Sequence, residues 1–188
     1  MNTMKPATLR HVFGWFAAVL LAGCDYTVPL AEKPESPIDK ALVGHWQTTL
    51  DGKDVRLSVL ALAADEYLVA YPSGTPDTLY ARACLCQGTE FALVQLRWFG
   101  SANARADFSA RPYQFAAYAV EGDTLIARLI NPEVVKPAQT ATALLSAIKA
   151  NNTNPDLFRP ELRFTRVKPP ADPHAPVARP PLPAGWDK

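Results

Sequence analysis

Residues 43–62 read VGHWQTTLDGKDVRLSVLAL and contain two strand-like runs that flank Asp51-Gly52. In the second run, apolar residues at positions 55, 57 and 59 alternate with polar ones, which gives an extended chain one apolar face. Asp-Gly between two such runs is the strongest short-range signal for a β-hairpin. The stretch therefore predicts an antiparallel hairpin over residues 43–62.

The same period of two continues downstream with short connections, and it predicts a meander of consecutive antiparallel strands. Turn-forming residues at 72–76, 87–88 and 121–123 separate the runs. Together with the opening hairpin, the strand candidates cover residues 43–50, 53–62, 66–72, 77–85, 89–99, 113–120 and 124–130.

One helix and one more strand complete the predicted domain. Ala141, Leu144, Leu145 and Ile148 fall on one face of a helix over residues 139–152. The run ELRFTRV at the end of the domain then reads as another strand. The sequence thus predicts a mainly β domain over residues 42–167, an antiparallel meander of about eight strands that forms a barrel or half-barrel, with one helix before the last strand.

Gly44-His45-Trp46, on the first predicted strand, resembles the glycine-any-tryptophan signature on the first strand of lipocalins. The helix before a final strand is also similar to that family. The resemblance implies a calycin-like barrel whose base is closed by the tryptophan, often beneath an arginine, and here Arg163 or Arg166 would take that part. Trp46 is accordingly expected to be a structural anchor and not a ligand contact.

The first 24 residues, MNTMKPATLRHVFGWFAAVLLAGC, have the composition of an export signal. A basic start precedes an uncharged run over residues 12–21, which is shorter than the about 20 residues that a membrane span needs. Leu21-Ala22-Gly23-Cys24 matches the lipobox of bacterial lipoproteins. This resemblance to a lipoprotein precursor implies that residues 1–23 are a signal peptide that is removed, and that the Cys24 thiol receives a diacylglyceryl group.

Asp25, directly after the lipidated cysteine, resembles the sorting signal that retains some lipoproteins in the inner membrane. The expected location is therefore the bacterial cell envelope, with the chain anchored by lipid on Cys24 and facing the periplasm, and with the inner membrane favoured over the outer. Two or three acyl chains attach a protein stably, whereas one chain binds only marginally. The membrane is thus the first expected partner.

Proline-rich stretches flank the predicted domain. Residues 24–41 lack an apolar period, and their prolines predict an extended, lipidated tether that would lift the domain off the membrane. Residues 168–188 are richer still in proline and are expected to form a disordered tail. Trp186 near its end is either a docking handle or an incidental aromatic residue.

Cys84 and Cys86 would reach an oxidising compartment after export. They lie one residue apart, so on a strand they share a face. The sequence leaves three alternatives: buried or half-buried free thiols, a disulfide within or between chains, or a metal or redox pair. A disulfide between such close neighbours would be strained, and two thiolates without a nearby histidine form a weak metal site.

The net charge and the motifs of the sequence bear on which classes of function it could have. Removal of the signal leaves 17 Lys and Arg against 18 Asp and Glu, because two of the 19 basic residues lie in it. This near-neutral balance gives no electrostatic footprint for nucleic acid. The sequence shows no metal-ligand spacing, phosphate loop or nucleophile elbow. We therefore expect no cofactor and no enzyme activity.

Two functions remain as expectations. The first is a small binding module, in which a barrel interior lined by aromatic residues holds an apolar ligand. The second is an interaction protein that uses its sheet and its proline-rich tail to scaffold a cell-envelope complex. The aromatic candidates in the strand region are Tyr67, Tyr71, Tyr80, Trp98, Phe99, Phe108, Tyr113, Phe115 and Tyr118.

Overall fold

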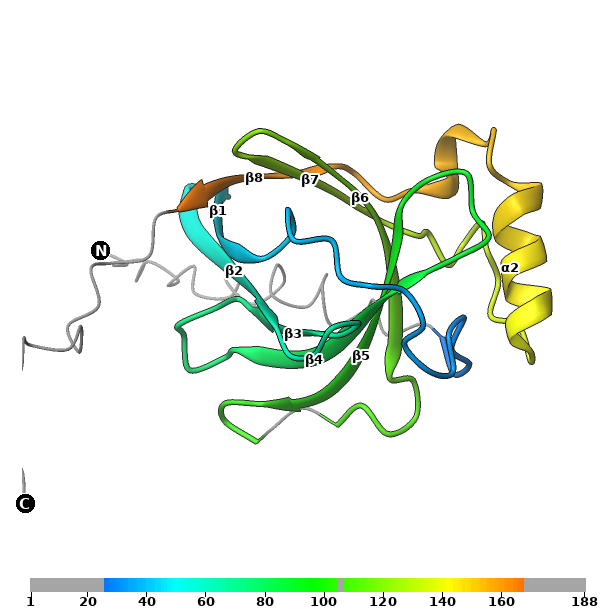
Figure 1. Cartoon of the computed structure of the whole chain (residues 1–188), viewed down its shortest axis with the longest axis horizontal. Helices are drawn as coiled ribbons and strands as arrows, with labels where there is room; N and C mark the ends of the chain where they lie inside the picture. The colour runs from blue at the N-terminus through cyan, green and yellow to red at the C-terminus, as the bar shows by residue number, and fades with distance from the viewer. Residues whose placement is uncertain (1–25, 105–106, 168–188) are drawn as a thin grey trace, which may run out of the picture.

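The computed structural model describes residues 26–104 and 107–167, which contain a closed barrel of antiparallel strands. The strands follow one another around the barrel in chain order, and β1 pairs with β8 to complete the ring (Figure 1). Within these residues one α-helix, α2 (Ala141–Ala150), precedes the last strand. The strands are β1 (Gly44–Leu50), β2 (Lys53–Ala61), β3 (Tyr67–Tyr71), β4 (Leu79–Cys86), β5 (Leu93–Ser101), β6 (Tyr113–Glu121), β7 (Thr124–Leu129) and β8 (Leu162–Val167).

This architecture confirms the fold class predicted from the sequence, an antiparallel meander with a helix before its last strand. The sequence left a barrel and a half-barrel open, and the structure shows the closed form. Closure removes the sheet edges, whose unpaired backbone groups would otherwise be free to pair with other chains.

The β1–β2 hairpin forms where the sequence predicts it. Its strands pair without interruption from Gly44 to Leu50, so that Asp51 and Gly52 make a two-residue turn. Both turn residues have positive φ, 50° and 73°, as a type I′ turn requires. The twist of this turn matches the twist of the flanking strands, which explains why Asp-Gly is a reliable signal here.

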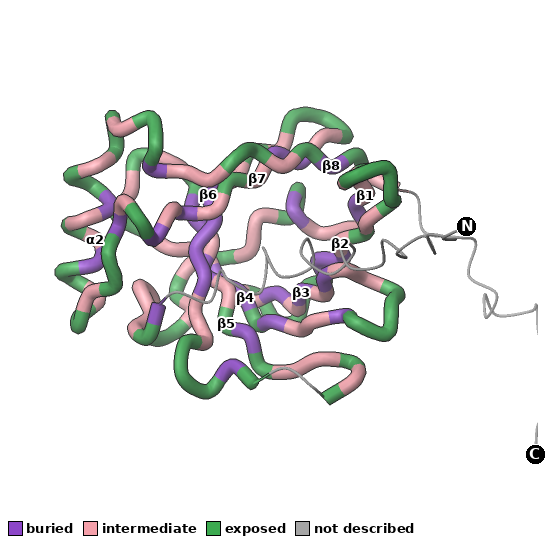
Figure 2. Tube along the Cα trace, turned by 180° about the vertical axis from the view of Figure 1, so that it is seen from behind, coloured by how far each residue is buried: buried purple, intermediate pink, exposed green. Residues whose placement is uncertain are grey.

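Inward-facing side chains of the strands form the first of two hydrophobic cores. On β3, Tyr67, Val69 and Tyr71 are buried, whereas the residues between them are only half-buried. Figure 2 shows this alternation of buried and less buried residues along the strands. The period of two in the sequence therefore corresponds to the inside and the outside of the barrel.

A second core lies outside the barrel wall, between β5, β6 and helix α2. Leu93 and Phe115 point outward from the strands and belong to one buried cluster with Leu144 and Ile148 of the helix. Thr140 caps the start of the helix with its hydroxyl. The helix thus covers the wall from outside and does not enter the barrel (Figure 1).

The described part of the predicted tether, residues 26–41, contacts the barrel at several points and does not extend freely from it. Tyr26 is only 1% exposed. Its ring meets Phe115 edge-on at 5.0 Å between centroids, and its hydroxyl donates to the Val135 carbonyl (3.1 Å). Buried side chains such as Tyr26 therefore attach this segment to the wall.

The same segment closes one end of the barrel, and Figure 1 shows it in blue as it crosses in front of the strands. The Ile38 amide donates to the Ala64 carbonyl (3.0 Å), and the Asp39 amide donates to the Tyr67 hydroxyl (2.6 Å). The following turn places Leu42 in the interior core. We call this the sealed end; the connections β3–β4 and β5–β6 form the opposite, far end.

Trp46 and Arg166, partners across the β1–β8 pair, complete the ring at the sealed end. The Trp46 side chain is fully buried, and its Nε1 donates to the Leu42 carbonyl (2.9 Å). Arg166 Cζ lies 4.0 Å from the centroid of the Trp46 ring, and its guanidinium donates to the carbonyls of residues 41 and 43 (2.7 and 2.8 Å). Gly44 leaves space for it, since an added Cβ would lie 2.5 Å from Arg166 Nη1.

Replacing Arg166 with lysine should reduce the free energy of unfolding by about 1–2 kcal/mol. A lysine lacks the planar fork that holds two carbonyls and covers an aromatic ring at once. Arg163→Lys is the matched control, because the Arg163 side chain is 62% exposed against 29% for Arg166. This control should change stability by less than about 0.5 kcal/mol. Urea unfolding followed by circular dichroism measures both, and equal losses would contradict the assigned role of Arg166.

Candidate functional site

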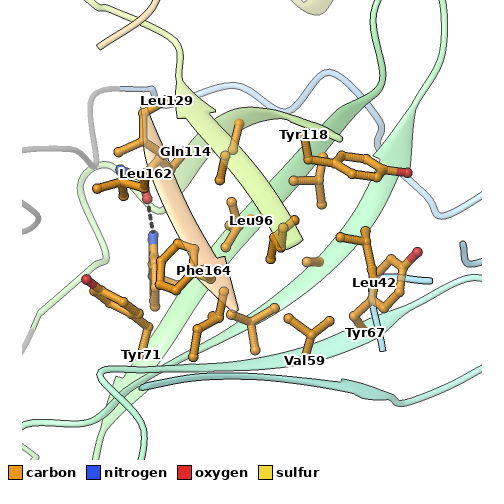
Figure 3. A pocket seen from close by; sticks show the side chains of 18 residues that line it. Leu42, Val59, Tyr67, Tyr71, Leu96, Gln114, Tyr118, Leu129, Leu162 and Phe164 are labelled. Carbon is orange, nitrogen blue, oxygen red and sulfur yellow. Dashed lines mark hydrogen bonds between the residues drawn. The ribbon is translucent and has the colours of Figure 1, made fainter. Parts of the chain in front are cut away.

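The barrel interior contains a cavity of about 120 Å³. Side chains from β2 to β8 and Leu42 line it, and Figure 3 shows their arrangement. The interior of an eight-stranded barrel is just wide enough for side chains to fill it. Three alanines in the wall, Ala83, Ala116 and Ala127, leave space that larger residues would occupy.

At the sealed end, two tyrosines contribute their rings to the cavity wall and direct their hydroxyls out of it (Figure 3). The Tyr118 hydroxyl donates to Asp39 Oδ2 (3.3 Å), and the Tyr67 hydroxyl accepts from the Asp39 amide. Burial raises the pKa of both tyrosines, and the negative charge of Asp39 adds to both shifts. Both phenols therefore stay protonated at neutral pH, with their polar atoms turned away from the cavity.

At the far end, aromatic rings surround the cavity. Trp98 donates its Nε1 hydrogen to Gln114 Oε1 (3.2 Å), and Phe108 stacks on Trp98 with 6.1 Å between centroids. Tyr71 meets Phe164 edge-on at 6.3 Å. Figure 3 shows the Tyr71 hydroxyl pointing away from the cavity, and burial raises its pKa. This hydroxyl is buried without a hydrogen-bond partner among the residues that the structure describes.

The cavity wall is almost entirely carbon, so its chemistry is that of an apolar binding site. Its polar side chains are tyrosines, Trp98 and Gln114; the Trp98 indole bonds to Gln114 Oε1, and the Tyr118 hydroxyl bonds to Asp39. Within the described ranges no acid, lysine or histidine lines the cavity. The lining therefore offers no general base and no charged group that would act on a bound molecule.

The cavity volume limits the guest. Apolar cavities of about 150 Å³ stay dry and bind benzene or xenon, whereas pockets for drug-sized ligands begin at about 300 Å³. A space of about 120 Å³ fits a molecule the size of a single small ring, or one end of a longer apolar chain.

The aromatic residues singled out in the sequence divide between three environments. Those that line the cavity are Tyr67, Tyr71, Trp98 and Tyr118, with Phe108 stacked on Trp98. Those in the second core are Tyr113 and Phe115. Those stacked on the outside of the barrel are Tyr80 and Phe99. An interior lined by the whole set was therefore too broad an expectation.

Cys84 and Cys86 are free thiols that point outward from β4, beneath the segment before β1. Gln95 Nε2 lies 3.8 Å from Cys84 Sγ. The same side chain accepts hydrogen bonds from the amides of residues 30 and 31 and donates one to the carbonyl of residue 31. Burial raises the pKa of the Cys84 thiol to about 11 and that of the Cys86 thiol to about 12. Among the described residues no group of three or more His, Cys, Asp or Glu is arranged to hold a metal ion.

Of the other positions singled out in the sequence, the structure describes His45 but not Cys24, Asp25 or Trp186. His45 lies opposite Ser58 on β2, and its Nδ1 is 2.9 Å from Ser58 Oγ. Sequence reasoning missed Asp39 and Gln95, since no motif marks a single polar residue that holds a neighbouring segment in place.

Comparisons with known proteins do not assign a family. No family model matches the chain, and no curated protein matches it significantly. In the ranges that the structure covers, no helix combines the length and the apolar character that crossing a membrane requires.

The two thiols should resist alkylation in the folded protein. With pKa values of about 11 and 12, almost no thiolate exists at pH 8. We expect iodoacetamide to label the peptide containing Cys84 and Cys86 at least about 100-fold more slowly in the folded protein than in urea, where thiols have a pKa near about 8.5. Mass spectrometry of that peptide measures both rates. Comparable rates in the two solutions would contradict the burial of the thiols.

Proposed function

We propose that this protein is a non-catalytic binding module that holds a small apolar molecule inside its barrel. The observation that carries the proposal is the cavity of about 120 Å³ with a carbon-lined wall. A buried water needs two to four polar partners, which this wall does not offer. An apolar guest instead gains by leaving water, since burial of apolar surface is favourable.

The sealed end supports a lipocalin-like interpretation of the barrel. The resemblance in the sequence implied a tryptophan at the base beneath an arginine, and Arg166 covers the buried Trp46 in this way. Leu42 and the segment before β1 block that end. The guest would therefore enter at the far end, near Tyr71 and Trp98.

The cellular context of this proposal comes from the sequence. Residues 1–23 act as a signal peptide, Cys24 carries the lipid, and Asp25 keeps the protein at the inner membrane, facing the periplasm. A barrel held at a membrane surface is well placed for an apolar guest, because such molecules concentrate in the bilayer.

Xenon and benzene should bind saturably to the wild-type protein, seen as a saturating xenon NMR shift and as a melting temperature that rises with benzene concentration. Ala116→Leu should abolish both effects, because Ala116 lines the cavity and a leucine would fill it. Ala119→Leu is the matched control, on the same strand but exposed. A wild-type protein that binds neither guest would reject the binding module and favour the alternative of an interaction protein.

The lipid anchor has its own test. Cys24→Ala should leave an unprocessed precursor, because the thiol that accepts the diacylglyceryl group is missing. Intact mass and detergent partitioning report the outcome. A variant that is cut before residue 24 and keeps the same membrane attachment would refute the anchor.

A further inference from the structure

A row of residues on the outer wall joins the start of the described chain to the outer face of β5. Tyr26 forms an isolated β-bridge with Tyr113 of β6. In the sheet, Tyr113 is the cross-strand partner of Arg97 on β5, and Arg97 is the partner of Arg82 on β4. Cross-strand partners project from the same face, so these side chains form one row across neighbouring strands. Because strands lie about 4.8 Å apart, Arg97 is about 10 Å from Tyr26.

Next to this row, Phe99 and Tyr80 form an aromatic pair on the outside of β5 and β4. Phe99 is the extra residue of a β-bulge, since Tyr80 pairs with Gly100 and Ala81 pairs with Trp98. Bulges redirect a side chain at the expense of local pairing. Here the bulge leaves Phe99 57% exposed and stacked on Tyr80 with 6.5 Å between ring centroids. Phe99 belongs to neither hydrophobic core, so its exposed ring does not contribute to their packing.

The charge beside the aromatic pair is positive. Arg82 is engaged by Glu66, with 2.7 Å between Nε and Oε1. Arg97 is exposed and has no ion-pair partner in the part of the chain that the structure describes. Two carboxylates, Asp77 and Asp107, lie in the loops at the far end, where they accept hydrogen bonds from uncharged groups. The outer face of β5 thus presents a guanidinium next to two aromatic rings.

The proposed acylation site is close to this surface. Tyr26 is fixed in the outer wall, and Cys24 precedes it by two residues. An extended chain spans at most about 3.6 Å per residue, so the two residues that separate the acylated position from Tyr26 can span at most about 7 Å. Phe99 lies two residues along β5 from Arg97, a further step of about 7 Å. A lipid attached two residues before Tyr26 would hold this part of the wall near the bilayer.

We infer that the outer face of β5, with Phe99, Tyr80 and Arg97, rests on the phospholipid headgroups of the membrane that holds Cys24. This inference depends on the lipid anchor of the proposed function and is independent of the apolar guest. Aromatic rings favour the boundary between headgroups and hydrocarbon, and a guanidinium binds phosphate oxygens through charge-assisted hydrogen bonds. The anchor and the surface would together fix the orientation of the barrel, with the far end close to the bilayer.

Spin labels test this orientation in the full acylated protein. One label is attached at Phe99→Cys and another at Leu60→Cys. The buried Cys84 and the half-buried Cys86 stay unlabelled, because their raised pKa values leave almost no thiolate. Leu60 is the matched control, because it is 42% exposed but lies on β2, three strands away around the barrel. In vesicles of phosphatidylethanolamine and phosphatidylglycerol, power saturation measures collisions with oxygen, which enters lipid, and with a nickel chelate, which stays in water.

At position 99, collisions with the nickel chelate should be about threefold or more below those at position 60, and collisions with oxygen should be higher. Equal accessibility at the two positions, in protein whose mass includes the acyl chains, would overturn the inference. Protection of position 99 from both reagents would also overturn it, since a protein surface would then cover the ring. Absence of acyl chains from the mass would refute the anchor, whereas xenon binding reports separately on the cavity.

Discussion

Closing a meander into a barrel requires its first and last strands to pair, and in this protein that closure depends on a short seam. β1 and β8 share three residue pairs, centred on Trp46 and Arg166, whereas β1 and β2 share seven. The indole fills the interior, and the guanidinium above it holds the chain that enters β1. The Arg166 amide also donates to the Asp123 carbonyl (2.8 Å), so one residue joins β8, the entrance to β1 and the β6–β7 turn.

Two features of the surrounding structure explain how the barrel keeps an unfilled apolar cavity. Asp39 accepts a hydrogen bond from the Tyr118 hydroxyl of β6 outside the cavity. No polar group inside the barrel is therefore needed to pair with this hydroxyl. A second core on the outer wall buries further apolar side chains under α2 and the segment before β1. An empty apolar space reduces stability, and the second core supplies hydrophobic burial that does not depend on filling the barrel.

Local signals in the sequence account for most of the fold. Asp51-Gly52 predicted its hairpin because the turn type depends on these two residues alone, and the period of two predicted the strands. The burial of Tyr26 was not predictable, because its partners lie in β6 and in the segment before α2, far along the chain. For the same reason the sequence did not separate Arg163 from Arg166. The register of the strands determines which of the two arginines lies over Trp46, and it also determines which aromatic residues face the cavity.

The most direct test of this account is the free energy of unfolding of Trp46→Ala, measured in urea against Phe99→Ala. Loss of the buried indole should remove about 3–5 kcal/mol, a large part of the about 5–15 kcal/mol by which domains are usually stable. Loss of the exposed Phe99 ring should change stability by no more than about 0.5 kcal/mol. Small and equal effects of the two substitutions would show that the barrel does not depend on the Trp46–Arg166 seam.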